Sequence, residues 1–412
     1  MFALNEMQKM VQDMMRQYCT KEIQPHVEKM EDGEVSCFDL ARKMMKMFGG
    51  EAMIKPALEK LAKKREEGEK SGTDLAKLLG GGDEAAGGMG DDPMIMAIMI
   101  KEVSRVSPGM AMSFGVSMAL AGGAVVSKGT ARQIRKYGIP LMTLEKIGAW
   151  CLTEPGAGSD AFGSMKTVAR VKGDKYFLNG TKTFITNGPV ADYFIVYAKM
   201  DRGQPAEQRP VHTFILEKGM KGLSTGKPFH KMGMKDSPTC EVFMDDVEVG
   251  IENLVGETES SEGRKATKES LGNERSGVPA MCWGIIERCY EECIKYARER
   301  VQFGRPIGEF QAIQLKIYEM YMHLKNVENI VYRTAWMQKK GIRDIAFINA
   351  SKCYTSQAAV HVANLAIQIF GGYGYMREYP VEKMFRDAKL LELGAGTSDI
   401  NALTAARHEL QL

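Results

Sequence analysis

Apolar residues recur at intervals of three and four along the first third of the chain. Met7, Met10, Val11 and Met14 follow this spacing, and the segment from Met94 to Val103 repeats it. Because 3.6 residues complete one helical turn, the spacing places these side chains on one helix face. Residues 1–145 are therefore predicted to be helical.

Residues 50–88 interrupt this pattern with a run rich in Lys and Glu, followed by a cluster of glycines. This composition predicts a solvated helix and then a loop. Two interpretations stay open: a charged surface insertion, or an element that docks a partner. Asp91 and Asp92 come next, and they belong either to a solvated loop or to the chemistry of a nearby cavity.

The periodicity changes near residue 146. Between about 146 and 257, short runs rich in β-branched and aromatic residues are separated by turn residues, including Asn179-Gly180 and Asn187-Gly188. The predicted strands are Tyr176 to Leu178, Thr183 to Thr186, Tyr193 to Ala198, Val211 to Leu216 and Cys240 to Met244. Their spacing favours a compact antiparallel barrel or sandwich.

Helical patterns return after Glu257, at 268–299, 308–340, 343–370 and 397–410. Four helices of this length suit a bundle. The chain, with 412 residues, is long enough for several cores. We predict an α+β protein with an N-terminal helical domain (1–145), a β domain (146–257) and a C-terminal four-helix bundle (258–412).

Charge and cysteine content narrow the function classes. A net charge of +3 argues against binding of nucleic acid or of an anionic membrane surface. The eight cysteines lack metal-binding spacing, so reduced thiols and no metal site are expected. The N-terminus lacks the features of an export signal, and the apolar runs identified fall short of the roughly 20 residues that span a bilayer. A cytoplasmic protein without integral membrane association is expected.

Several blocks combine small, aromatic and hydroxyl residues. The segment from Trp150 to Asp160 places glycines and a serine after a strand, where they let the backbone approach a flat ligand closely. Phe184 and Thr186 are two residues apart and so share a strand face. The further blocks are Arg300 to Gln311, Gln368 to Gly374, Arg386 to Lys389 and Gly396-Thr397.

In order, spacing and context, these blocks resemble the acyl-CoA dehydrogenase family across nearly the whole chain outside residues 50–88. The resemblance implies an enzyme that removes a proton and a hydride from adjacent carbons of an acyl thioester. It also implies FAD held between the β domain and the C-terminal helices with help from a neighbouring subunit, a homotetramer built as a dimer of dimers, and electron transfer to an electron-transferring flavoprotein.

The resemblance also assigns roles to individual residues. Those along the flavin ring are Trp150, Leu152, Thr153, Gly158 and Ser159, of which Ser159 also touches CoA, with Phe184 flanking the ring and Thr186 at its N5 side. Those for the pyrophosphate and adenosine are Arg300, Gln302, Phe303, Gln368, Gly371 and Gly372, with Thr397 near the end of the cofactor. Asp399 stands where most members have Gln, two residues after that Thr. Alternatively, Phe184 is a core aromatic and the two glycines only cap a helix.

The catalytic base is not at its usual place. Most members have Glu immediately before the Gly-Thr pair, where this chain has Ala395 preceded by Gly394. A subset that includes isovaleryl-CoA dehydrogenase has Gly-Ala-Gly-Thr there and keeps the base on another helix, directly before an arginine. Glu274 and Arg275 match that pattern.

Glu274 also stands out from its own surroundings in the sequence. It precedes Val278, Met281 and Ile285 on one apolar helix stripe, where a carboxylate is costly to bury and tends to be functional. We expect Glu274 to take the α-proton while the β-hydride passes to flavin N5, and Arg275 to contact CoA. A purely structural ion pair of Glu274 is the alternative.

Small residues shape the expected acyl pocket. Ala111, Gly115 and Gly394 leave room for a branched, cyclic or aryl acyl group, although long straight chains stay possible. A backbone N–H at Ala395 or beside it is expected to polarise the thioester carbonyl. Two other functions stay open: the enoyl-CoA reductase direction of the same chemistry, and a non-catalytic flavoprotein scaffold.

Overall fold

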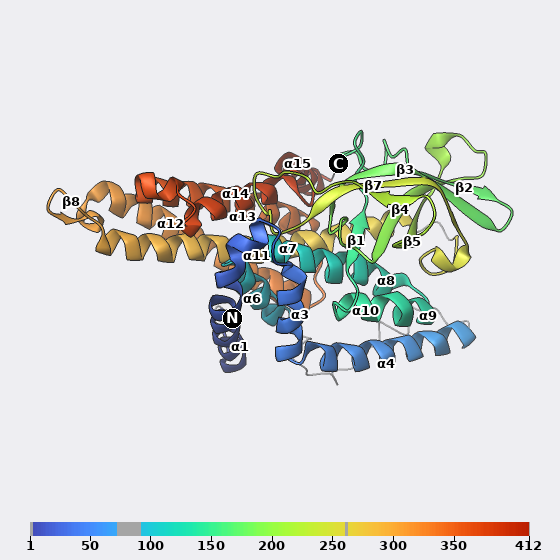
Figure 1. The fold of residues 1–412 in the computed structure, drawn as a ribbon, viewed down its shortest axis with the longest axis horizontal. Coiled ribbons are helices and arrows are strands. Elements are labelled where there is room, and N and C mark those ends of the chain that lie inside the picture. Colours follow the sequence, from blue (N-terminus) through green and yellow to red (C-terminus); the bar gives the residue numbers. More distant parts are fainter. Residues whose placement is uncertain (1–2, 72–91, 260–262, 412) are drawn as a thin grey trace.

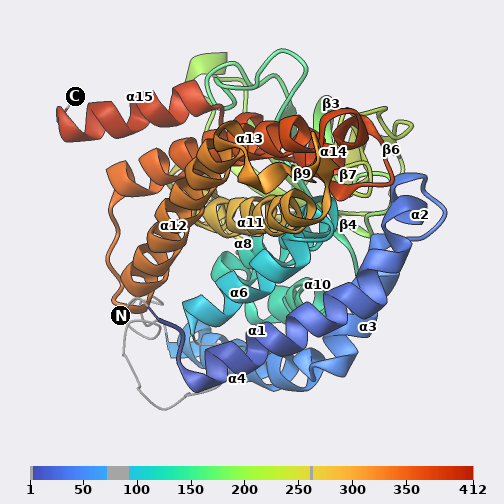
Figure 2. The same cartoon turned by 90° about the vertical axis from the view of Figure 1, so that its left-hand side faces the viewer.

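The computed structural model describes residues 3–71, 92–259 and 263–411, and the side chains of residues 69–71 and 263–274 lie outside this description. In Figure 1 the central sheet lies on the right, while long C-terminal helices extend to the left. The N-terminal helices lie below both, with α4 along the lower edge. Figure 2 shows α12 and α13 beside each other in the C-terminal part.

The first part is helical, as the apolar spacing predicted. Side chains that cap helix starts include Asn5, Ser36, Asp92 and Ser107. Asp92 accepts hydrogen bonds from Met94 N and Gln8 Nε2, so it is tied to the fold, and Asp91 lies outside the described residues. The elements are α1 (Glu6–Tyr18), η1 (Cys19–Ile23), η2 (Gln24–His26), α2 (Val27–Glu31), α3 (Cys37–Met47), α4 (Gly50–Ser71), α6 (Pro93–Ser104), α7 (Pro108–Gly115), η3 (Val116–Gly122), α8 (Gly123–Lys128), α9 (Ala131–Gln133), η4 (Ile134–Gly138) and α10 (Ile139–Met142).

Helix α4 covers the first half of the expected insertion. Leu58 and Ala62 are buried against Ile134 and Ile139, and Arg135 bonds to two glutamates of α4. The charged helix therefore packs against the domain along one face and is solvated on the other. The glycine-rich loop predicted after it lies outside the described residues.

One helical run is longer than the apolar runs identified from the sequence. Residues Pro108–Lys128 form 21 helical residues that are long and apolar enough to cross a membrane by length and composition. The expectation of shorter runs was wrong because Gly and Ser residues interrupt the apolar side chains of this segment, although its mean hydropathy stays high. The most apolar stretch is 61% buried inside the protein, as is usual for a core helix.

The central part is a seven-stranded mixed sheet with the order β1-β4-β2-β3-β7-β6, and β5 also pairs with β4. The predicted antiparallel pairing holds for β2–β3, β3–β7, β4–β5 and β6–β7, whereas β1–β4 and β2–β4 are parallel. The elements are β1 (Gly148–Cys151), β2 (Val168–Lys172), β3 (Lys175–Thr186), β4 (Tyr193–Asp201), η5 (Ala206–Gln208), β5 (Val211–Glu217), β6 (Leu223–Thr225), β7 (Thr239–Val249) and η6 (Ile251–Asn253).

The pair Asn179-Gly180 does not form the predicted hairpin turn. It lies inside β3, where the register with β7 shifts between Leu178 and Gly180. Gly180 has a φ of +150°, and a Cβ there would lie 2.5 Å from Thr167 Oγ1. Glycine is therefore required by a bulge and a close approach.

The C-terminal part contains the four predicted helices and a further one, α14, which the sequence analysis missed. Ile98 of α6 and Ile285 of α11 are fully buried in one core that joins the two helical parts. The elements are α11 (Gly263–Glu299), β8 (Val301–Gln302), β9 (Arg305–Pro306), η7 (Ile307–Glu309), α12 (Gln311–Lys339), α13 (Ile345–Phe370), η8 (Gly371–Tyr375), α14 (Pro380–Leu393) and α15 (Ser398–Glu409).

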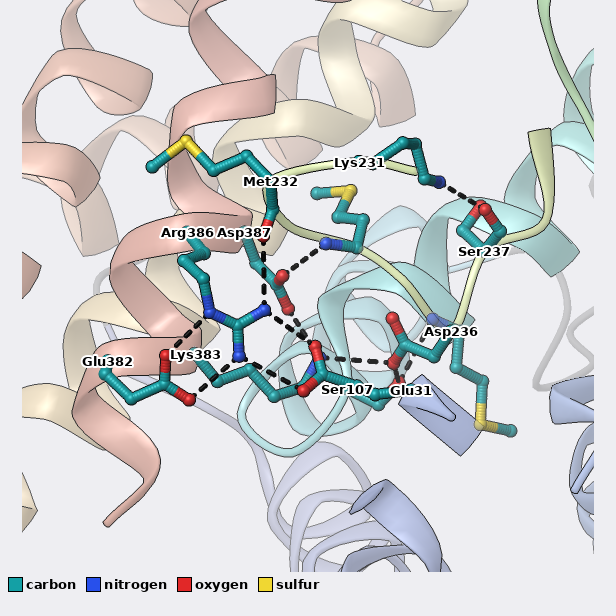
Figure 3. A network of polar contacts seen from close by, with 12 residues as sticks. Glu31, Ser107, Lys231, Met232, Asp236, Ser237, Glu382, Lys383, Arg386 and Asp387 are labelled. Atoms are coloured by element: carbon teal, nitrogen blue, oxygen red, sulfur yellow. Dashed lines mark hydrogen bonds and ion pairs between the residues drawn. The ribbon is translucent and has the colours of Figure 1, made fainter. Parts of the chain in front are cut away.

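Helix α14 takes part in a buried polar junction of all three parts (Figure 3). Lys383 Nζ lies 2.7 Å from Asp387, and 3.4 Å from both Asp236 and Glu31. Burial raises the pKa of Asp387 to about 6. Asp236 comes from the loop before β7, and Glu31 from α2. Because buried charges are costly unless paired, this junction fixes how the three parts meet.

Candidate active site

Helix α11 carries Glu274, the expected base, and contacts the loop that contains Ala395. The α11 backbone includes Glu274, whose side chain lies outside the described residues. Its neighbour Arg275 donates from Nε to the carbonyl of Ala395 at 3.0 Å, and from Nη1 to Asn349 Oδ1 at 3.1 Å. Val278, Met281 and Ile285 are buried, which confirms the predicted apolar stripe. The Arg275 side chain therefore ties this part of α11 to the Ala395 loop.

The loop from Gly394 to Thr397 is held by side chains on its carbonyls. Lys352 Nζ donates to Gly396 O at 2.7 Å, and Asn401 Nδ2 donates to the same oxygen at 2.7 Å. Both Lys352 and Asn401 are fully buried. Ala395 and Gly396 have φ values of +56° and +85°, a region that favours glycine. The loop is thus fixed in an unusual conformation.

Two backbone N–H groups of this loop have no acceptor among the described residues. Across the residues that the structure describes, the N–H groups of Ala395 and Gly396 donate to no other group. The nearby carbonyls, by contrast, accept from Arg275, Lys352 and Asn401. A rigid pair of free donors can stabilise a developing oxyanion.

On the sheet side, a buried ion pair anchors the strand end after β1. Lys182 Nζ lies 2.9 Å from Glu154 Oε1 and donates to Leu152 O at 3.1 Å. Glu154 also accepts the N–H groups of Lys166 and Thr167. Burial alone would raise the pKa of Glu154, but Lys182 and these donors outweigh burial and lower it. The ion pair thereby holds the Leu152–Thr153 segment against β3.

Several predicted flavin contacts are exposed on this side. Phe184 is 71% exposed and has a φ of +57°, with its ring 5.7 Å from that of Phe229. The alternative that Phe184 is a core aromatic was therefore wrong. Gly158 and Ser159 are also exposed, and a Cβ on Gly158 would meet no atom within 4 Å. Trp150 and Thr186 are half-buried, while Leu152 is buried.

The end of β3 is tied to the helix that carries the expected acyl-pocket residues. Asn187 Nδ2 donates to Ser113 O at 2.8 Å and to Gly148 O at 2.9 Å. Ser113 lies on α7 between Ala111, which is buried, and Gly115, where a Cβ would meet nothing within 4 Å. Asn187 thus connects the sheet to this helix.

The other predicted cofactor contacts gather elsewhere. An open pocket of 640 Å³ is lined by residues that include Arg300, Gln302, Gly371 and Gly372. Gly371 also ends α13 with a φ of +62°, so it caps the helix as well. Figure 1 shows β8 at the left end of the molecule, far from the sheet on the right. Within one chain, the predicted contacts therefore form two separate groups.

The remaining predicted contacts lie near these groups or on α15. Phe303 is 94% exposed at the tip of the β8–β9 hairpin, and Gln368 is exposed on α13. Thr397 caps α15 by accepting the N–H of Ile400, and Asp399 is exposed in the first turn of that helix.

The two groups together fit the parts of FAD. Phe184 offers an exposed aromatic face, and Gly158 leaves space for close backbone approach. In the second group, the Arg300 guanidinium lies over the Tyr373 ring at 5.6 Å, beside the open glycines. A guanidinium suits phosphates, and an aromatic ring suits a base.

Sequence reasoning missed the residues that hold the site in place, namely Glu154, Lys182, Asn349, Lys352 and Asn401. A lysine inside a strand or an apolar helix is the signal that could have found Lys182 and Lys352, since a buried lysine requires partners. Each of the five binds at least one backbone carbonyl or N–H group, which carries no sequence signal.

Three family profiles match successive parts of the chain. They are described as the acyl-CoA dehydrogenase N-terminal domain at residues 50–145, middle domain at 149–247 and C-terminal domain at 261–410.

Among curated proteins, the short-chain-specific acyl-CoA dehydrogenase of Clostridium acetobutylicum is 37% identical over 77% of this chain and 82% of its own. A caffeyl-CoA reductase-Etf complex subunit of Acetobacterium woodii is 38% identical over 78% and 83%. Mitochondrial isovaleryl-CoA dehydrogenase of Oryza sativa is 39% identical over 79% and 78%.

Solved structures of acyl-CoA dehydrogenases are also similar to this chain over almost its full length. Butyryl-CoA dehydrogenase of Megasphaera elsdenii covers 99% of both chains with a TM-score of 0.82 and 31% identity. An acyl-CoA dehydrogenase of Bacillus anthracis complexed with FAD has a TM-score of 0.81 and 30% identity, over 99% of this chain and 67% of that one. Members of the family bind FAD. This chain belongs to the acyl-CoA dehydrogenase family and is an oxidoreductase that acts on acyl-CoA thioesters.

Proposed function

We propose that this enzyme performs α,β-dehydrogenation of an acyl-CoA thioester with Glu274 as the base. The observation that carries the proposal is the bond from Arg275, the residue after Glu274, to the carbonyl of Ala395. Glu274 directly precedes Arg275 on α11, which supports it as the carboxylate that serves the loop where the resemblance puts the base of most family members. An alanine there cannot accept a proton, so a base from another element is required.

In this proposal Glu274 accepts the α-proton, and the free N–H groups of Ala395 and Gly396 donate to the thioester oxygen. Donation to that oxygen stabilises the negative charge that develops as the proton leaves. Arg275, Lys352 and Asn401 keep the loop rigid, so the donors need no reorganisation during the reaction.

FAD, when bound, accepts the hydride that leaves the β-carbon. Thr153, Gly158, Ser159, Phe184 and Thr186 would hold its ring, with Trp150 and Leu152 supporting that segment. Arg300, Gln302, Phe303, Gln368, Gly371 and Gly372 would hold its phosphates and adenosine, and Thr397 and Asp399 would lie at its end. Because the two groups are far apart within one chain, we propose that each cofactor is shared between subunits of a homotetramer.

The acyl group is proposed to be branched, cyclic or aryl. Ala111, Gly115 and Gly394 are small, and no side chain of the described residues would clash with a methyl group at Gly115.

We propose an electron-transferring flavoprotein as the acceptor, since a relative is part of an Etf complex. The same relative is a reductase, which keeps the reverse direction as a second candidate. The cytoplasm is the proposed compartment, because all eight cysteines are free.

The test is anaerobic loss of the oxidised flavin band with straight, branched, cyclic and aryl acyl-CoA thioesters, followed by turnover of Glu274→Gln. Loss of the base should lower turnover on the order of 100-fold or more. Glu299→Gln, at the exposed end of the same helix, is the matched control and should keep full turnover. Turnover of Glu274→Gln within a few-fold of the parent would overturn the assignment of the base, and a flavin that no thioester bleaches would favour the reductase or the scaffold.

A further inference from the structure

A second cluster of chemically active side chains lies on the helical bundle, apart from the residues assigned above. Among the described residues, Glu319, His323 and His361 form a group whose potential ligand atoms all lie within 4.8 Å of one another. Glu319 and His323 are four residues apart on α12, and His361 comes from α13, which packs beside it. We propose that these three residues bind a divalent transition-metal ion of the zinc type.

The ligand set suits such an ion. Two imidazoles and one carboxylate form a recurrent set for Zn²⁺, and three protein ligands leave a position for water. A tetrahedral ion with bonds of roughly 2.0–2.1 Å holds its ligand atoms roughly 3.3 Å apart. Glu319 Oε1 and His361 Nε2 are 2.8 Å apart, so this pair would separate by roughly 0.5 Å around such an ion. The ligand atoms of the whole group lie within 4.8 Å of one another, so the widest pair would close by up to roughly 1.5 Å.

The second histidine is already oriented. His323 Nδ1 lies 3.2 Å from the Tyr354 hydroxyl, which also accepts a hydrogen bond from Asn326 Nδ2 at 3.2 Å. Histidines that bind metals commonly have such an outer partner, which fixes the plane of the ring. The rings of His323 and His361 lie edge to face, with centres 5.4 Å apart.

The position of the cluster gives the ion a role. Its ligands come from two helices, so a bound ion would link α12 to α13. His361 lies seven residues before Gln368, which is two helical turns and roughly 10 Å along α13. The ion would therefore brace the helix that ends at the pocket with Arg300, Gly371 and Gly372. The cluster was invisible in the sequence because His361 is 38 residues from His323 and has no metal-binding spacing.

The experiment uses the FAD-containing enzyme after removal of metals with a chelator. Zn²⁺ is titrated in competition with a chromogenic chelator, and thermal unfolding is followed with and without Zn²⁺. We expect one ion per subunit, a higher Tm with Zn²⁺, and affinity lower on the order of 100-fold in both His323→Gln and His361→Gln. His408→Gln, on α15, is the matched control and should bind like the parent protein.

Flavin content and the Tm without metal show whether each variant is folded. Absence of bound Zn²⁺ in the parent protein, or equal affinity in the parent protein and His361→Gln, would overturn the proposal and leave a Glu319–His361 hydrogen bond as the whole role of the cluster. Loss of Zn²⁺ affinity in each of the single variants His361→Gln and Glu319→Gln, at unchanged flavin content, would support the proposal.

Discussion

Replacing Arg275 by Met tests whether this arginine positions the Ala395 loop or only binds CoA. The change removes hydrogen bonds of 3.0 Å to Ala395 O and 3.1 Å to Asn349 Oδ1. A hydrogen bond from a charged donor contributes about 1.5–3 kcal/mol, so two contribute about 3–6 kcal/mol. Both partners of the loop bond are half-buried, and water can replace part of the loss. We therefore expect the activation free energy of flavin reduction to rise by about 2–3 kcal/mol, which corresponds to a roughly 30- to 160-fold lower rate.

The assay is stopped-flow reduction of the bound flavin at saturating acyl-CoA, without oxygen. A positioning role predicts a slower reduction step at saturation, because misplaced N–H donors stabilise the oxyanion poorly. Arg298→Met, on the exposed end of α11, is the matched control. An unchanged reduction rate combined with a raised KM would refute the positioning role, since it would show that Arg275 contributes binding energy only.

Three further predictions concern other parts of the molecule. Gly158→Val should leave the Tm of the apoprotein unchanged, because a Cβ there meets no protein atom within 4 Å. The valine side chain would instead occupy space proposed for FAD and weaken FAD binding at least ~10-fold, which titration of the apoprotein with FAD measures. Lys182→Met should lower the free energy of unfolding by about 3–5 kcal/mol, since it leaves Glu154 as an unpaired buried charge, and thermal unfolding beside Lys175→Met, on the same strand, is the check. Burial would raise the pKa of Glu31, but Arg386 and Lys383 lower it from 4.5 to about 2. The stability that this carboxylate contributes is therefore full above pH 4.5 and is lost as the pH falls towards 2. Between these pH values the Tm of Glu31→Gln should fall less steeply than the Tm of the parent protein, and equally steep falls would contradict this.

The sequence predicted what local patterns determine. The stripe of Val278, Met281 and Ile285 follows from helical periodicity alone, and it is buried as expected. Helix α14 was missed because Pro380, at its first turn, and polar residues such as Arg386 obscure an apolar face that packs around Lys383 and Asp387. Local patterns therefore identify elements better when their buried face is wholly apolar.

Contacts between distant residues could not be predicted in the same way. Lys352 and Asn401 bind the carbonyl of Gly396, and a carbonyl is present at every position of every sequence. Asn179-Gly180 is typical of a hairpin, yet the approach of Thr167 turns it into a bulge. The separation of Arg300 from Phe184 depends on the arrangement of whole domains.

Exchange of the α-hydrogens of an acyl-CoA analogue in D₂O tests the central claim most directly. An analogue without β-hydrogens, such as 3,3-dimethylbutyryl-CoA, cannot lose a hydride, so exchange reports proton removal alone. Under conditions where the analogue perturbs the flavin spectrum, we predict α-exchange in the parent enzyme and in Glu299→Gln, and exchange lower on the order of 100-fold or more in Glu274→Gln. Exchange that persists in Glu274→Gln, at unchanged flavin content, would show that another group takes the proton.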